Sequence, residues 1–272
     1  MSVLKARSLS VGYGEKTVLD DLDLQVPKGK ITVLIGKNGC GKSTLLSAFA
    51  RMIKPESGEV YLNGKKMAMS KTKKIARELA VLPQGPVAPE GITVRQLVKQ
   101  GRYPYQSWLR QWSEEDESCV QRALKVTKME ELADRPVESL SGGQKQRAWI
   151  AMVLAQNTET ILLDEPTTYL DLSHQIEILD LLYDLNKSEG RTIVMVLHDL
   201  NLACRYADNI VAIHNKCVCA EGCPEHIMTE QLVKDVFNMD VKIDRDPLFG
   251  CPMCIPYGKG RVVKNEPYAV LS

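Results

Sequence analysis

Short apolar runs, separated by longer segments with helical spacing, make up most of this chain. Residues 31–35, 79–82, 160–163 and 192–197 are rich in leucine and β-branched side chains and lack the polar alternation of a half-exposed strand. Such runs indicate strands that are buried on both faces, as in a parallel sheet covered by helices. The pattern therefore predicts an α/β fold.

The N-terminal part shows a different pattern. Residues 3–11 and 17–26 are predicted to be strands, with Gly12–Gly14 as the turn between them. Residues 59–62 predict another strand, and Asn63–Gly64 after it is typical of a hairpin turn. Antiparallel strands are therefore expected beside the parallel sheet.

From about residue 85 to residue 157 the pattern becomes helical. Thr93 is expected to cap one helix, and Ser113 with Asp116 to form a capping box for another. This section predicts a helical lobe inserted between strands of the sheet.

The rest of the chain returns to alternating helices and strands. A helix is predicted from Asp171 to Gly190, where a glycine ends the apolar periodicity. Residues 210–213 and 217–220 indicate a hairpin at the edge of the sheet, and residues 224–272 indicate a helix followed by a proline-rich tail.

The first candidate for chemistry lies directly after the apolar run 31–35. Residues 36–44 fit the pattern G-x-x-x-x-G-K-[ST] of a phosphate-binding loop and lead into an apolar helix. The glycines allow the backbone to fold tightly around an anion, at which the helix aims its positive end. We expect Lys42 to reach the β- and γ-phosphates and the Ser43 hydroxyl to bind Mg²⁺. Cys40, at the helix N-terminus, is expected to have a lowered thiol pKa and to be alkylated readily.

Polar residues follow three of the buried runs. Asp164 and Glu165 come directly after residues 160–163, where the carboxyl end of a central strand would place them beside the glycine loop. Asp164 would then join the Mg²⁺ shell, and Glu165 would accept a proton from the attacking water. Gln84 and His198 are candidates at the same edge, although such residues can also serve packing or capping.

Two further features point to a nucleotide. Tyr13 lies in a glycine turn before the loop and could stack on a base, or be an ordinary half-buried surface residue. Ser141 and Gln144 fit a capping box at the start of the apolar helix 148–155. The Gly142–Gly143 pair leaves the backbone bare at this second positive helix end, which indicates another anion site.

Composition narrows the class of protein. The chain has 35 basic and 34 acidic residues, so no bulk charge favours nucleic acid as a partner. The N-terminus lacks the apolar core of a signal peptide, and no apolar run approaches the roughly 20 residues that span a bilayer. We therefore expect a cytosolic chain with reduced thiols. Five of its eight cysteines come late, including Cys251 and Cys254 in a C-x-x-C whose surroundings match no metal pattern; a metal- or redox-gated role remains an alternative.

Together these motifs resemble the nucleotide-binding subunit of ATP-binding cassette transporters, over nearly the whole chain. The resemblance implies a P-loop NTPase core of the RecA-like type, with an inserted helical subdomain and N-terminal antiparallel β strands. It implies an α/β core of residues 1–85 and 158–223, within a domain of about 3–240. It also implies a helical subdomain of residues 86–157 that carries the signature motif, and a C-terminal helix and tail of residues 224–272.

The resemblance also assigns the site, with ATP and Mg²⁺ as cofactors. The expected catalytic residues are Glu165 as base, His198 as switch histidine, Gln84 of the Q-loop and Lys42. The expected metal ligands are Ser43, Gln84 and Asp164. The residues expected to bind the nucleotide are Tyr13, Gly36, Lys37, Asn38, Gly39, Cys40, Gly41, Lys42, Ser43, Thr44, Ser141, Gly142, Gly143 and Gln144.

Family resemblance further implies a homodimer. Two copies would pack head to tail, so that each ATP lies between the glycine loop of one copy and Ser141–Gly143 of the other. A ligand held by both copies stabilises the closed dimer, and Gln84 would relay the motion to a membrane permease.

Several segments narrow the branch of the family. The ferric-siderophore, haem and cobalamin import group, and most of all its siderophore members, is what five segments look like: residues 101–104, 144–152, 164–171, 198–201, and 246–247 with 255–256. This implies a peripheral ATPase on the cytoplasmic face of the cell membrane, with integral permease subunits and, indirectly, an extracellular or periplasmic binding protein. The alternatives are an importer for haem or cobalamin and a soluble ATPase that acts as scaffold in iron–sulfur assembly. A nucleic-acid or ribosomal role is less favoured, since those relatives usually carry two cassettes.

Overall fold

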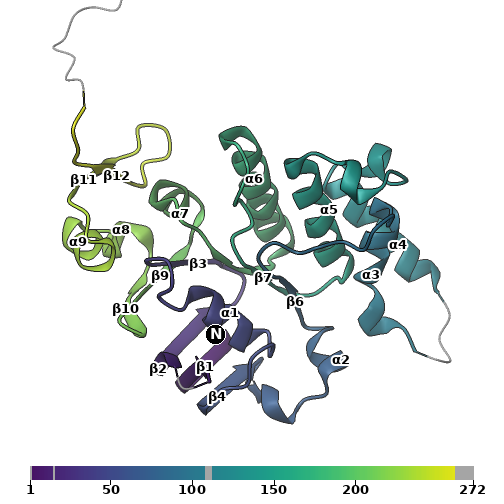
Figure 1. The fold of residues 1–272 in the computed structure, drawn as a ribbon, viewed down its shortest axis with the longest axis horizontal. Helices are drawn as coiled ribbons and strands as arrows, with labels where there is room; N and C mark the ends of the chain where they lie inside the picture. The colour runs from purple at the N-terminus through teal and green to yellow at the C-terminus, as the bar shows by residue number, and fades with distance from the viewer. Residues whose placement is uncertain (1, 15, 108–111, 261–272) are drawn as a thin grey trace, which may run out of the picture.

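The computed structural model describes residues 2–14, 16–107 and 112–260, and its centre is a six-stranded sheet (Figure 1). The strand order is β10-β9-β3-β8-β7-β6, with every neighbouring pair parallel except β9 and β10. The strands are β3 (Ile31–Ile35), β6 (Leu79–Leu82), β7 (Thr160–Leu163), β8 (Thr192–Val196), β9 (Asn209–His214) and β10 (Cys217–Gly222). All four apolar runs are therefore strands of one parallel sheet, as predicted.

The central strands are buried because both faces of the sheet are covered. In β3, the side chains of Ile31, Val33 and Ile35 enter one hydrophobic core, whereas Leu34 enters the other. Consecutive side chains of a strand point to opposite faces, so a strand between two cores must be apolar throughout. The first core lies under α5 (Gly142–Ala155), α6 (Leu172–Glu189) and α7 (Leu200–Tyr206). The second lies under α1 (Lys42–Phe49) and the N-terminal strands.

The N-terminal strands form a separate antiparallel sheet of order β2-β1-β4-β5. Its strands are β1 (Ser2–Tyr13), β2 (Lys16–Pro27), β4 (Ser57–Leu62) and β5 (Lys65–Lys66). Leu22, Leu24 and Val26 of β2 are buried, as the alternation of apolar and polar residues predicts. Asn63 and Gly64 both have positive φ and join β4 to β5 in the expected hairpin turn. The short helices η1 (Met67–Met69) and α2 (Thr72–Ile75) follow.

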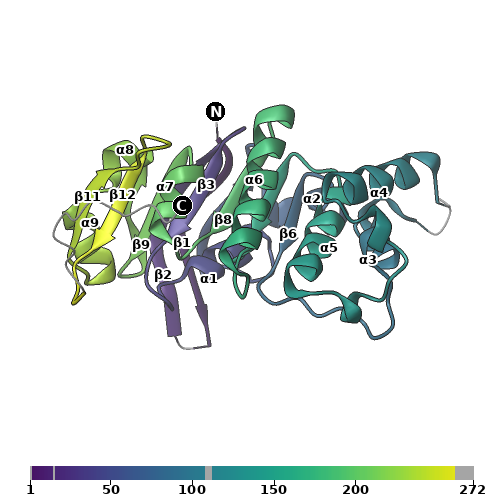
Figure 2. The same ribbon diagram turned by 90° about the horizontal axis from the view of Figure 1, so that it is seen from above.

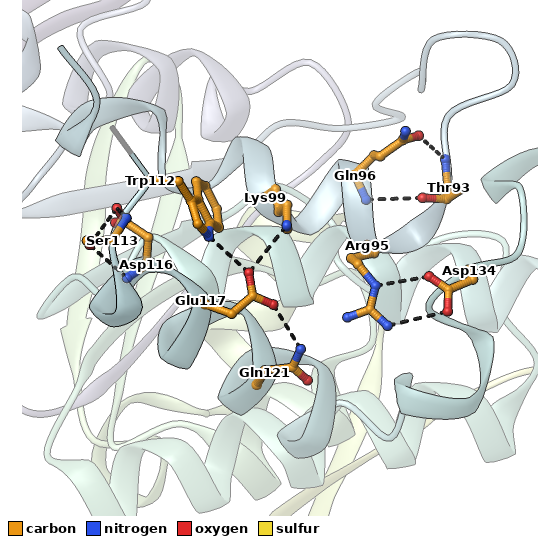
Figure 3. Close-up of polar contacts among 10 residues, drawn as sticks. All are labelled: Thr93, Arg95, Gln96, Lys99, Trp112, Ser113, Asp116, Glu117, Gln121 and Asp134. Atoms are coloured by element: carbon orange, nitrogen blue, oxygen red, sulfur yellow. Dashed lines mark hydrogen bonds and ion pairs between the residues drawn. The ribbon is translucent and has the colours of Figure 1, made fainter. Parts of the chain in front are cut away.

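The helical lobe lies at one end of the molecule, opposite the C-terminal segment (Figure 2). It contains α3 (Val94–Gln100), η2 (Tyr103–Tyr105), α4 (Glu114–Val126), η3 (Glu130–Leu132), η4 (Val137–Ser139) and α5. Both predicted caps are present, because the Thr93 and Ser113 side chains each accept a hydrogen bond from the backbone N–H three residues on (Figure 3). The sequence-based boundaries of the lobe, residues 86–157, remain a prediction.

A polar network fixes the exposed side of this lobe (Figure 3). Glu117 of α4 accepts hydrogen bonds from Trp112 Nε1 at 2.9 Å and Gln121 Nε2 at 3.0 Å, and it pairs with Lys99 of α3 at 3.3 Å. Beneath it, Arg102 and Asp116 form a fully buried ion pair with Nε and Oδ1 2.9 Å apart. The Lys99–Glu117 pair joins α3 to α4, and the Arg102–Asp116 pair joins the turn after α3 to α4, so these ion pairs hold the two helices of the lobe together.

The C-terminal part of the chain confirms one prediction and corrects another. The hairpin of β9 and β10 lies at the edge of the sheet, as expected, with β10 as the edge strand and β9 paired with β3. Residues 224–260 are not a helix and a tail. They form α8 (Pro224–Ile227), α9 (Glu230–Phe237) and an antiparallel hairpin of β11 (Val241–Arg245) and β12 (Pro252–Pro256). None of the described helices is both long and apolar enough to cross a bilayer.

Candidate active site

Most of the predicted site residues from the glycine loop and the sheet line one groove; the exceptions, which belong to the same loop and strand end but do not line it, are Gly36, Lys37, Cys40 and Asp164. Parallel strands all end at the same edge of a sheet, so the segments that follow β3, β6, β7 and β8 converge there. The groove has a volume of about 650 Å³. Its lining residues are Tyr13, Val18, Asn38, Gly39, Gly41, Lys42, Ser43, Thr44, Gln84, Glu165, Thr168, Tyr169 and His198.

The glycine loop connects β3 to α1, and its conformation requires glycine. Gly36, Gly39 and Gly41 have φ values of 149°, 77° and 110°, where other L-residues are strained. A side chain at Gly36 would also collide with the Ile213 carbonyl of the neighbouring strand β9. The loop is thus held against the sheet at Gly36, while Asn38, Gly39 and Gly41 line the groove.

Lys42 is buried at the start of α1 and points back into this loop. Its Nζ donates hydrogen bonds to the carbonyl oxygens of Gly36 at 2.7 Å and Lys37 at 3.0 Å. An ammonium group in this position adds positive charge to a helix N-terminus that has no acidic residue in its first turn and, among the described residues, no side-chain cap. The arrangement suits a bound phosphate group.

Ser43 and Asp164 form the second part of the site. The Ser43 hydroxyl donates to Asp164 Oδ1 at 3.0 Å, which joins α1 to the end of β7. Burial raises the pKa of Asp164, and the Ser43 hydrogen bond offsets this only in part. A hydroxyl and a carboxylate are the oxygen ligands that Mg²⁺ prefers, so the donor set fits that ion.

Glu165 is the centre of the third part, with a side chain that is 12% exposed. It accepts hydrogen bonds from Gln84 Nε2 at 2.7 Å and Thr168 Oγ1 at 2.8 Å, and its Oε1 lies 2.7 Å from His198 Nε2. Burial alone would raise the pKa of Glu165, but the hydrogen bonds from His198, Thr168 and Gln84 outweigh burial and lower it. The group is therefore an ionised carboxylate that can accept a proton. Glu165 also has a φ of 52°, a strained backbone state that occurs at functional sites.

Aromatic side chains stand at the mouth of the groove. Tyr13, at the end of β1, is 57% exposed, so its side chain is accessible to a ligand in the groove. Tyr169 is 95% exposed and has a φ of 64°. Sequence reasoning did not place Tyr169, Thr168 or Val18 in the site. For Thr168 a signal existed, since a hydroxyl three residues after a strand-end carboxylate can reach back to it.

Four predicted residues lie elsewhere in the chain. The groove of a single copy is not lined by Ser141, Gly142, Gly143 or Gln144, which form the start of α5 in the helical lobe. Ser141 Oγ accepts from the Gln144 N–H at 3.3 Å and Gln144 Oε1 accepts from the Ser141 N–H at 3.1 Å, so the capping box is complete. The box satisfies the N–H groups of Ser141 and Gln144, whereas those of Gly142 and Gly143, at the first two helical positions, have no partner within the helix.

Cys40 corrects an expectation. Burial raises the pKa of its thiol, and the nearby Lys42 charge does not compensate. The predicted lowering by the helix N-terminus is therefore wrong, because desolvation of the thiol exceeds the effect of the helix end. The raised pKa favours the neutral thiol form of Cys40.

Two of the late cysteines, Cys251 and Cys254, lie in the C-terminal hairpin. Cys254 of β12 is buried and its thiol hydrogen-bonds to that of Cys204 on α7. Asn201 Oδ1 accepts from the Cys254 N–H at 2.7 Å and fixes the same contact. In the described part of the chain, no His, Cys, Asp and Glu side chains form a group of three that could hold a metal ion.

Comparison with known sequences gives consistent matches. The model of the ABC transporter family matches residues 19–168. A probable siderophore transport system ATP-binding protein of Bacillus subtilis is 64% identical, over 98% of this chain and 97% of its own length. A petrobactin import ATP-binding protein of Bacillus anthracis is 63% identical over 97% and 96%. A ferric enterobactin transport ATP-binding protein of Escherichia coli is 46% identical over 94% of both chains.

Solved structures agree with these matches. A chain from an inward-facing structure described as a metal-chelate type ABC transporter superposes with a TM-score of 0.82 at 27% identity, covering 95% of this chain and 99% of that chain. A dimeric ATP-binding cassette in a post-hydrolysis state, bound to ADP and phosphate, gives a TM-score of 0.71 at 29% identity, over 81% and 98%.

Proposed function

Since the chain belongs to the ABC transporter family, we propose that it is the ATP-hydrolysing subunit of an importer for ferric siderophores. The observation that carries the proposal is the groove that Lys42, Ser43 and Glu165 line, with Asp164 hydrogen-bonded to Ser43 behind it, because this arrangement suits the hydrolysis of a nucleoside triphosphate. The siderophore follows from the relatives, since those that match over nearly their full length are named for siderophore, petrobactin and enterobactin transport.

Different residues of the chain would have different roles in ATP hydrolysis. The glycine loop and the N-terminus of α1 hold the phosphates, and Lys42 exchanges its two carbonyl partners for phosphate oxygens. Glu165 accepts the proton of the attacking water, while His198 and Gln84 orient its carboxylate. Tyr13 stacks on the base.

Mg²⁺ would be held by Ser43, Asp164 and Gln84. The ion would neutralise charge on the phosphates during transfer. The Ser43–Asp164 contact supports this assignment, because it brings a hydroxyl and a buried carboxylate to the end of the glycine loop.

A homodimer would complete the site. Because Ser141–Gln144 lie outside the groove of their own chain, a second copy in the opposite orientation would bring them to the ATP. The dimeric cassette with ADP and phosphate supports this assembly. ATP held by both copies stabilises the closed dimer, by about 2.7 kcal/mol at a hundredfold excess over its dissociation constant.

The dimer would act at the cytoplasmic face of the cell membrane, as a peripheral partner of integral permease subunits. Those subunits, with an extracellular or periplasmic binding protein, would choose the iron chelate. The relatives' names favour this function over haem or cobalamin import and over a scaffold in iron–sulfur assembly.

A growth and uptake assay tests the proposal. A strain that lacks this chain should lose uptake of labelled ferric siderophore, and the wild-type chain but not its Glu165→Gln variant should restore it. Petrobactin, a hydroxamate and a catecholate are compared with haem and cobalamin as controls. Normal uptake of every iron chelate in the deletion strain would refute the proposal.

A further inference from the structure

The start of α6 is built around one carboxylate. Asp171 caps this helix, and its Oδ1 accepts from the His174 N–H at 2.9 Å and from the Ser173 hydroxyl at 2.9 Å. The same oxygen lies 2.7 Å from His174 Nδ1. These hydrogen bonds, first that of the His174 N–H, lower the pKa of Asp171 to about 2. Asp171 is therefore ionised at neutral pH, and His174 Nδ1 is the donor in the contact between them.

The ring that Asp171 orients lies against Gly143 at the start of α5. A Cβ atom on Gly143 would be 2.5 Å from Cδ2 and 2.9 Å from Cγ of His174, so any larger residue would displace the ring. Leu170 lies in ordinary contact, at 3.9 Å from the corresponding Cβ position of Gly142. Gly143 does not have a positive φ, so what excludes a side chain at this position is the neighbouring imidazole.

The same segment begins at the catalytic carboxylate. Thr168 donates to Glu165, the Leu170 N–H donates to the Thr167 carbonyl at 3.3 Å, and Gln175 Nε2 donates to the Leu170 carbonyl at 2.8 Å. Residues 165–175 thus touch the hydrolysis groove at one end and Gly142–Gly143 at the other. The groove and the Gly142–Gly143 turn are therefore connected through the packing and hydrogen bonds of this one segment.

We propose that His174 is a positioning residue: held by Asp171, its ring fixes the Gly142–Gly143 turn in the position that meets the ATP of a second copy. This rests on the proposed function, in which that turn contacts the opposite copy's nucleotide. His174 touches neither the groove nor its own chain's nucleotide site. Loss of the His174 ring therefore weakens the ATP-bound dimer and leaves the affinity of a single chain for ATP unchanged.

Substitutions at 174 separate the ring from its hydrogen bond. Phe keeps the ring and loses the bond to Asp171, Asn keeps a donor near the Nδ1 position and loses the ring, and Ala loses both. Ser173→Ala is the matched control, because it removes another hydrogen bond to Asp171 and lies on the same helix turn. All variants are made in the Glu165→Gln background, so that ATP binds without turnover.

Two quantities are measured: the dissociation constant of the ATP-bound dimer, by sedimentation, and the affinity of dilute monomer for a fluorescent ATP analogue. We expect His174→Ala and His174→Asn to weaken the dimer about tenfold, His174→Phe to recover most of this, and Ser173→Ala to stay within twofold. Monomer affinity is expected to be unchanged in all four.

An unchanged dimer in His174→Ala, or a parallel loss of monomer affinity, would overturn the role of His174. Failure of the Glu165→Gln parent itself to dimerise with ATP would refute the proposed function, and this inference with it.

Discussion

Glycines lie at the starts of both α1 and α5, but only the start of α5 is capped by a side chain. At α1 no side chain caps the first turn, and Lys42 turns back onto the carbonyls of Gly36 and Lys37. At α5 the Ser141–Gln144 capping box is complete. A side-chain cap stabilises a helix start, but the box at α5 uses only the Ser141 and Gln144 N–H groups and leaves those of Gly142 and Gly143 without an intrahelical partner. Both helix starts therefore keep backbone donors for a ligand, with those of α1 beside the groove of the same chain and those of α5 outside it.

The largest effect is expected from Glu165→Gln, which tests whether chemistry belongs to the groove at α1. Loss of the proton acceptor should lower ATP turnover by about two to four orders of magnitude and leave ATP-dependent dimerisation intact. A turnover assay measures the loss of ATP hydrolysis, and sedimentation measures the ATP-dependent dimerisation. Glu159→Gln, at the opposite end of β7 and largely exposed, serves as control and should stay within twofold. Normal turnover in Glu165→Gln would exclude it as the base.

A smaller effect is expected from Ser141, which separates capping from ligand binding at α5. Ser141→Ala should lower the free energy of unfolding by about 1 kcal/mol, as measured by urea titration. Ser141→Asp keeps a good cap and should keep stability, but its charge should repel the phosphates and abolish ATP-dependent dimerisation.

Thr93→Ala provides the control for Ser141, because it removes the same kind of capping box from α3. It should cost similar stability with no effect on the dimer. If Ser141→Asp dimerised normally with ATP, α5 would be an ordinary helix start.

The smallest effect is expected in how stability depends on pH at Asp171, the residue that holds His174 against the start of α5. Its pKa is lowered to about 2 in the folded chain, so its charge stabilises the fold above its unfolded pKa of about 3.9 and is lost as pH falls toward 2. Asp171→Asn should retain the cap and melt slightly below wild type at neutral pH. The difference in melting temperature should be constant above about pH 5 and shrink below it. A difference that grew on acidification would contradict this assignment.

The sequence predicts the buried sheet because its signal is local. Each of the four apolar runs carries the burial pattern of its own strand, and the caps at Thr93 and Ser113 depend only on residues three positions apart. The hairpin of β11 and β12 escapes such reasoning. In β11 Val241 and Ile243 do alternate with Lys242 and Asp244, but its partner β12 begins and ends with proline and shows no such alternation, so the pairing is not apparent.

The candidate site divides in the same way. Motif and strand order alone were enough to place six residues at one edge of the sheet: Lys42, Ser43, Gln84, Asp164, Glu165 and His198. The burial that raises the pKa of Cys40 could not be predicted, since it depends on how the loop packs against the folded core. The contact of His174 with Gly143 escapes for the same reason, because it joins residues far apart in sequence.

The imidazole against Gly143 also bears on how such chains diverge. A methyl group at position 143 can be accommodated only in a chain whose residue 174 leaves room for it, so mutational drift at these two positions is not independent. A lineage that first replaced His174 by a smaller residue could then accept a side chain at position 143. A lineage that replaced Gly143 first would pass through an intermediate in which the new side chain collides with the imidazole.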